Sequence, residues 1–245
     1  MSGGILRFPW TRQPQTPAPI NAQHPMGTSW ALVHVPGVML FGDANPAGTF
    51  LANTSIGVGR SGRSLKQTGS AANSGLNFGA NSKLLLNTSS GIAVCTCVDA
   101  AGYSPIFDTA FGPLSGAFGL YVDISLGKIR LLKKDTALIL ESSNAVAQGG
   151  EVRLAWSYNA STGRARIALN GVLTSGTSAQ TLTHNQFNQG GYWSDHAAGT
   201  TPSEQALLAV SPVEQLSDAA LIWASLNPWQ LFAPLSRTIW VPAAA

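Results

Sequence analysis

Acidic side chains are the first candidates for chemistry in this chain of 245 residues, because carboxylates serve as general acids, bases and nucleophiles. Cleavage of a glycosidic bond needs two of them facing each other, about 5 to 10 Å apart. On one face of a strand, such a pair would stand two positions apart. None of the 11 acidic residues is two positions from another, and a pair assembled from separate strands is the alternative. We therefore expect no catalytic residues and no enzyme.

One segment, 192–196, combines aromatic rings with a carboxylate. This loop could stack on a sugar ring, so Trp193, Asp195 and His196 are candidates for glycan binding. The alternative is that Trp193 packs against a sheet edge while His196 is solvated. A single carboxylate is a poor cage for a divalent ion, and the 4 histidines lack the spacing of metal ligands. We expect no metal.

Glycines at 57, 59 and 62 match the G-x-G-x-x-G pattern of dinucleotide-binding loops. That pattern holds phosphate only when a strand precedes it and a helix follows. Residues 63–68 instead alternate between polar and apolar as a strand does, and no acidic residue lies about 20 positions further on. We therefore expect a glycine-rich turn and no cofactor.

The composition narrows the class of protein. Only 10% of residues are charged, against roughly 25% in ordinary soluble domains, so a mostly helical protein is disfavoured. The net charge of +3 is scattered along the chain, and basic clusters such as 60–66 and 128–134 lack interleaved aromatics, so we expect no nucleic acid. The chain has no run of about 18 apolar residues, so we expect no membrane insertion. Residues 1–21 show no secretory signal.

Short runs with β-strand character recur from residue 30 onward, separated by Gly, Asn, Ser or Pro. The clearest is a meander: residues 151–158 alternate, a turn follows, and residues 165–169 form the second strand. Asn170 and Gly171 then suit a type I′ turn that returns the chain at Val172. Ser217 is placed to cap one short helix that ends before Pro228. The other expected strands are 30–35, 64–68, 83–87, 92–98, 119–123, 128–133, 137–141 and 206–210.

The meander GEVRLAWSYNASTGRARIALNGV resembles the laminin-G-like, concanavalin A-like jelly-roll family. The tail LSDAALIWASLNPWQLFAPLSRTIWVPAAA and the opening PWTRQPQ resemble the ends of phage and prophage proteins of that family. The resemblance implies an all-β fold: an antiparallel two-sheet jelly-roll sandwich with one short C-terminal helix and extended termini. We expect a proline-rich arm at 1–27 that leaves the sandwich, the sandwich itself at 28–231, and a C-terminal extension at 232–245.

The ends of the chain suggest a role, since they carry large apolar residues that need cover. We expect a phage virion structural protein, made in the cytoplasm of the bacterial host, which forms homo-oligomers and attaches to other virion proteins through its termini. A lectin-like module that binds host-surface glycans is the alternative. The residues expected to bind virion partners are Phe8, Trp10, Arg12, Ile239 and Trp240.

Overall fold

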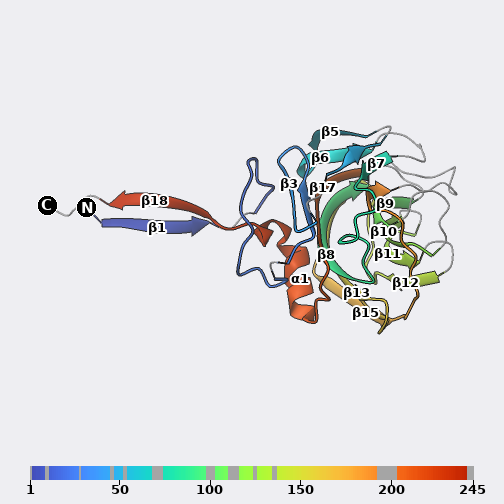
Figure 1. The fold of residues 1–245 in the computed structure, drawn as a ribbon. Coiled ribbons are helices and arrows are strands. Elements are labelled where there is room, and N and C mark those ends of the chain that lie inside the picture. Colours follow the sequence, from blue (N-terminus) through green and yellow to red (C-terminus); the bar gives the residue numbers. More distant parts are fainter. Residues whose placement is uncertain are drawn as a thin grey trace.

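The computed structural model shows two antiparallel β-sheets packed face to face, with a separate two-stranded ribbon made from both ends of the chain (Figure 1). This arrangement confirms the all-β, two-sheet sandwich expected from the sequence. The structure describes residues 2–8, 11–27, 29–44, 47–51, 54–67, 74–97, 103–109, 116–123, 126–133, 137–191 and 203–241.

The first sheet has seven strands in the order β12-β11-β10-β9-β16-β7-β4. It ends at β4, a strand of only two residues, so the sheet has a short edge on that side. Its strands are β4 (Thr49–Phe50), β7 (Ser74–Asn77), β9 (Tyr103–Asp108), β10 (Phe118–Asp123), β11 (Lys128–Lys133), β12 (Ala137–Glu141) and β16 (Asn188–Gly191).

The second sheet has nine strands, seven of them in the order β15-β14-β13-β8-β17-β2-β3. The other two form a hairpin, β5–β6, which joins the same side of β17 as β2 does. Its strands are β2 (Leu32–Val35), β3 (Met39–Phe41), β5 (Thr54–Gly59), β6 (Gly62–Gln67), β8 (Thr88–Cys97), β13 (Glu151–Asn159), β14 (Arg164–Leu169), β15 (Val172–Thr177) and β17 (Ser203–Ser211).

The predicted meander is confirmed as β13, β14 and β15, paired in sequence order. Asn170 has φ 49° and Gly171 has φ 87°, as a type I′ turn requires. Asn170 also accepts a hydrogen bond from the backbone N–H of Arg153 through Oδ1, at 2.9 Å. The turn that joins β14 and β15 is therefore also hydrogen-bonded to β13, the first strand of the meander.

Two apolar layers stabilise the molecule, one on each face of the nine-stranded sheet. The inner layer lies between the sheets and includes Trp156, Phe107 and Phe118, whose rings touch. The outer layer lies under α1 (Asp218–Leu226) and the 3-10 helix η1 (Pro228–Leu231). Alternation along β14 serves both layers, because Ile167 faces inward while Ala168 belongs to the outer layer.

The predicted helix cap is confirmed. The Ser217 side chain accepts a hydrogen bond from the backbone N–H of Ala220 at 3.2 Å, and the helix ends at Leu226, with Asn227 as its C-cap before Pro228. At nine residues, α1 is the longest helix in the described part of the chain, and none there is long and apolar enough to cross a membrane.

Two of the local predictions have opposite outcomes. The glycine pattern at 57–62 is confirmed as a turn, since Gly59 pairs with Gly62 at the end of the β5–β6 hairpin. The strand expected at 83–87 is wrong. Asn81 accepts backbone hydrogen bonds from Leu84 and Leu85 through its carbonyl, and from Lys83 through Oδ1, so the chain turns there.

The expected N-terminal arm is wrong over most of its length. Residues 11–27 pack on the sandwich, where Gln13 and Met26 are buried and Ile20 forms a β-bridge with Phe232. Of the described residues of this segment, only those of β1 (Ser2–Phe8) leave the domain, and β1 is paired with β18 (Leu235–Val241). Prolines do not prevent packing here, because side chains such as that of Gln13 make the hydrogen bonds that a strand would otherwise supply.

Candidate functional site

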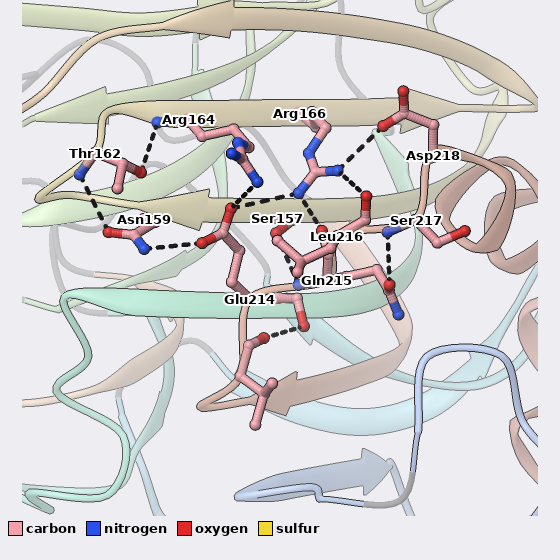
Figure 2. A network of polar contacts seen from close by, with 12 residues as sticks. Ser157, Asn159, Thr162, Arg164, Arg166, Glu214, Gln215, Leu216, Ser217 and Asp218 are labelled. Carbon is pink, nitrogen blue, oxygen red and sulfur yellow. Dashed lines mark hydrogen bonds and ion pairs between the residues drawn. The ribbon is translucent and has the colours of Figure 1, made fainter.

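A polar groove lies at one end of the meander, beside the start of α1. Figure 2 shows the polar contacts of Arg164, Arg166 and Asp218, which line it. Its cavity of about 360 Å³ is lined by strands β14 and β15 and by the loop between β17 and α1. The lining residues are Arg164, Arg166, Ser175, Gly176, Thr177, Leu216 and Asp218.

Strand periodicity places the polar side chains of this groove. Arg164 and Arg166 are two apart on β14, so they share the face opposite to the buried Ala165 and Ile167. Register then sets Thr177 of β15 opposite Arg164, and Ser175 opposite Arg166. Two guanidinium groups and two hydroxyls therefore stand on adjacent strands.

Arg166 is buried and holds the loop that closes the groove. Its Nη1 donates to the carbonyl of Leu216 at 2.8 Å and to Asp218 Oδ1 at 3.1 Å. Its Nη2 donates to the carbonyl of Gln215 and lies 3.5 Å from Glu214 Oε1. Since buried charges need partners, this guanidinium is a structural anchor with little capacity left for a ligand.

Glu214 connects the anchor to the strand edge. Its Oε1 lies 3.3 Å from Arg164 Nη1, and its Oε2 accepts a hydrogen bond from Asn159 Nδ2 at 2.8 Å (Figure 2). Arg164 and Asp218 are more than half exposed, in contrast to Arg166 and Glu214. The groups available to a ligand are thus one guanidinium, one carboxylate and the hydroxyls of β15.

The charges of the groove balance, with two arginines against two carboxylates. Such a surface offers donors and acceptors without a strong field, which suits a neutral ligand rich in hydroxyl groups. No cluster of three or more metal-ligating side chains occurs within the described ranges.

The glycan-binding residues expected from the sequence, Trp193, Asp195 and His196, lie outside the residues that the structure describes. So does Trp10. The remaining partner-binding candidates lie at the chain ends, with Phe8 opposite Leu235, Ile239 opposite Gly4, and Trp240 opposite Gly3 in the ribbon, while Arg12 is exposed at the start of the packed segment.

Sequence reasoning missed the polar groove. Alternation along β14 and the Asn-Gly turn were sufficient to place Arg166 opposite Ser175, so this half of the groove could have been found. The half supplied by Glu214 and Asp218 had no such signal, since a loop folds back over the sheet to bring them there.

Solved structures share the fold at low sequence identity. Domain 4 of an extracellular arabinanase from Geobacillus stearothermophilus, in complex with arabinotriose, is 17% identical with a TM-score of 0.58, over 74% of this chain and 89% of that one. The binding domain of a paraclostridial mosquitocidal protein is 8% identical with a TM-score of 0.58, over 80% of this chain and 51% of that one.

A Trypanosoma rangeli sialidase in complex with difluorosialic acid is 13% identical with a TM-score of 0.60, over 84% of this chain. The chain spans about a third of the length of that sialidase. No family model and no curated protein matches the sequence. The comparisons therefore support the β-sandwich fold and nothing finer; they lend no support to a phage or laminin-G assignment.

The expectation that this protein is not an enzyme is overturned by these comparisons, because the fold recurs in chains of sialidases. The spacing of acids along one strand does not report carboxylates that meet through the fold, which is the alternative stated from the sequence. Glu214 and Asp218 are four positions apart, yet both carboxylates contact the guanidinium of Arg166, which brings them together without a shared strand.

Proposed function

We propose that this protein is a glycan-binding β-sandwich whose polar groove takes a neutral, hydroxyl-rich saccharide. The observation that carries the proposal is the pair of exposed groups, Arg164 and Asp218, beside the hydroxyls of Ser175 and Thr177. A guanidinium donates to sugar oxygens and a carboxylate accepts from sugar hydroxyls, so the two together can bind adjacent hydroxyls of one ring.

The size and the charge of the groove support the same ligand class. A cavity of about 360 Å³ falls in the range typical of small-molecule sites. An acidic sugar would meet the carboxylate of Asp218, and the charge of Arg164 is balanced by Glu214, so the groove has no net positive charge to attract it. The likeness of the fold to a domain solved with arabinotriose supports a saccharide in general but does not assign this groove.

Calorimetric titration of the full chain with arabinotriose and other neutral oligosaccharides, and with a sialylated oligosaccharide for comparison, tests the proposal. We expect neutral saccharides to bind, and Arg164→Ala and Asp218→Asn each to weaken binding by about tenfold or more, the effect of losing a hydrogen bond to a charged group. Arg153→Ala is the matched control, because this exposed arginine also pairs with a glutamate but lies outside the groove.

Three outcomes would contradict the proposal: no saccharide binds, the acidic saccharide binds best, or the two groove variants bind like the wild type. Release of reducing sugar is measured in the same samples. Release that depends on Glu214 and Asp218 would replace the binding proposal by a hydrolase.

A virion location remains a second proposal about where such a module is carried. Its support is the resemblance of the opening and tail motifs to phage proteins, together with chain ends that form a ribbon outside the sandwich. Quantitative mass spectrometry of purified phage particles tests it. The protein should be present at a fixed stoichiometry to the major structural proteins, and its absence would reject the proposal.

A further inference from the structure

The two ends of the chain form a ribbon, β1–β18. This ribbon is a sheet of its own and pairs with neither sheet of the sandwich (Figure 1). Each strand has seven residues, and the only charged residues in them are Arg7 and Arg237. An isolated two-stranded ribbon is marginally stable in water, and its free edges attract other strands. This ribbon, rich in Ile, Leu, Phe, Trp and Val, is therefore a segment that needs a partner surface.

A second uncovered feature is an apolar groove on the sandwich, with a cavity of about 310 Å³. Three large apolar side chains at this groove are exposed: Leu40 at 38%, Phe50 at 49% and Ile56 at 42%. Such a concentration of exposed apolar groups marks a binding surface more often than chance. The full lining is His34, Gly37, Val38, Met39, Leu40, Gly48, Phe50, Ile56 and Leu76.

The apolar groove lies where both sheets end. Leu40 belongs to β3, the last strand on one side of the nine-stranded sheet, and Phe50 belongs to β4, the last strand of the other sheet. Ile56 comes from β5, the outer strand of the hairpin. A groove of apolar side chains beside terminal strands suits an extended apolar segment, which adds backbone hydrogen bonds to a sheet edge while its side chains fill the groove.

The ribbon is extended and rich in apolar residues, as a segment that binds in this groove must be. It cannot, however, fill the groove of its own chain. It runs outward from the domain, with both termini at its far end, whereas β3 and β5 lie on the body of the sandwich (Figure 1). We propose that the terminal ribbon of one copy docks in the apolar groove of a second copy, through the β18 residues Ile239–Val241.

This contact joins two different surfaces, so it is heterologous and each copy can both donate a ribbon and accept one. Repetition closes into a ring or continues as a chain of copies, depending on the rotation between neighbours. The polar groove is made of other residues, so the proposed contact does not use it. The inference therefore does not depend on glycan binding.

Light scattering coupled to size exclusion tests the proposal with full-length variants. The ribbon variant combines Ile239→Asp with Trp240→Asp, and the groove variant combines Leu40→Asp with Phe50→Asp. We expect the wild type to form oligomers and each variant alone to be a monomer. An equimolar mixture should form a one-to-one complex, because one variant keeps an intact groove and the other an intact ribbon.

Leu138→Asp is the control, since this leucine is equally exposed at 45% but lies on β12, at the opposite edge of the seven-stranded sheet. It should assemble like the wild type. Thermal melting checks that each variant is folded, and Ile56→Lys replaces the groove variant if the double substitution unfolds it.

A monomeric wild type would overturn the proposal. So would a folded groove variant that still assembles while the ribbon variant does not, because ribbons would then pair with ribbons. Failure of the mixture to form a complex would overturn it as well.

Discussion

Gly91 on β8 lies directly beneath the ring of Trp156, the largest fully buried side chain of the sandwich. A Cβ atom at this position would lie 2.3 Å from Trp156 Cη2 and 2.3 Å from the carbonyl oxygen of Ala209. Neither neighbour can move easily, because one is a packed ring and the other is the backbone of β17. The central strands can approach each other here only because the residue is glycine.

Gly91→Ala should lower the free energy of unfolding by about 1–3 kcal/mol, the usual cost of overpacking a core. Urea denaturation measures the change. Gly57→Ala serves as control, because its Cβ would meet only the flexible side chain of Lys66, at 3.1 Å. Equal effects of the two substitutions would show that loss of glycine itself, and not the contact with Trp156, decides the cost.

The N-terminal segment is fastened to the nine-stranded sheet by one amide side chain, that of Gln13. Its Nε2 donates to the carbonyls of Arg63 at 2.6 Å and Ala206 at 3.1 Å, and its Oε1 accepts from the N–H of Arg63 at 2.6 Å. The segment thereby connects β6 with β17, and we expect it to contribute to the free energy of unfolding of the sandwich.

Gln13→Ala should destabilise the fold by about 1–3 kcal/mol, because backbone groups lose their partners where water has little access. The neighbouring Gln15 is exposed, so Gln15→Ala should change the melting temperature little. Differential scanning calorimetry compares the two variants. A Gln13 variant as stable as the wild type would mean that the hydrogen bonds of Gln13 do not stabilise the domain.

The turn between β14 and β15 also supports the helix. The N–H of Gly171 donates to Ser225 Oγ at 3.0 Å, and a Cβ on Gly171 would lie 2.8 Å from Leu226 Cδ2. Gly171→Ala combines an unfavourable positive φ with this contact, so we expect a loss of about 1–3 kcal/mol.

Asn170→Gly tolerates the same backbone conformation and loses only the hydrogen bond to Arg153, so it should cost less in the same chemical denaturation. The opposite order of the two variants would show that the hydrogen bond between Asn170 and Arg153 stabilises the meander more than the turn conformation at Gly171 does.

At the scale of the whole molecule, two buried histidines make stability depend on pH. Burial lowers the pKa of His24 and of His34 from 6.5 to about 4. His34 Nδ1 lies 2.5 Å from Gln189 Oε1, which requires that this nitrogen carry the proton of the neutral ring. Both side chains are therefore neutral in the folded state and protonated in the unfolded state below pH 6.5.

Below pH 6.5 the unfolded state binds more protons than the folded state. The free energy of unfolding is therefore unaffected by the two histidines above pH 6.5 and falls as the pH decreases toward 4. Between pH 7 and pH 5 each histidine should cost about 2 kcal/mol. Urea denaturation at the two pH values measures the loss, and His34→Gln should remove from it the share of about 2 kcal/mol that belongs to His34. A variant with the same pH dependence as the wild type would reject the assignment to His34.

Local patterns in the sequence determined most of the sheet elements. The alternation of residues 151–158, the Asn-Gly turn and the cap at Ser217 depend on neighbours within a few positions, so the backbone conformation follows from the residues themselves. The prediction of a strand at 83–87 was wrong because Asn81 accepts hydrogen bonds from the backbone N–H groups of the residues that follow it. A hydrophobic pattern does not report such local hydrogen bonds.

Only the tertiary structure decided which distant residues meet. Pairing of β1 with β18 joins residues from 227 (Phe8 and Leu235) to 239 (Ser2 and Val241) positions apart, and the buried Arg166 of β14 contacts Glu214 in a loop and Asp218 at the start of α1. These contacts form because the sandwich brings its chain ends and loops together, and because a buried charge must find partners. The sequence by itself determined a chain of antiparallel strands with one capped helix; packing of the two sheets determined the grooves and the ribbon.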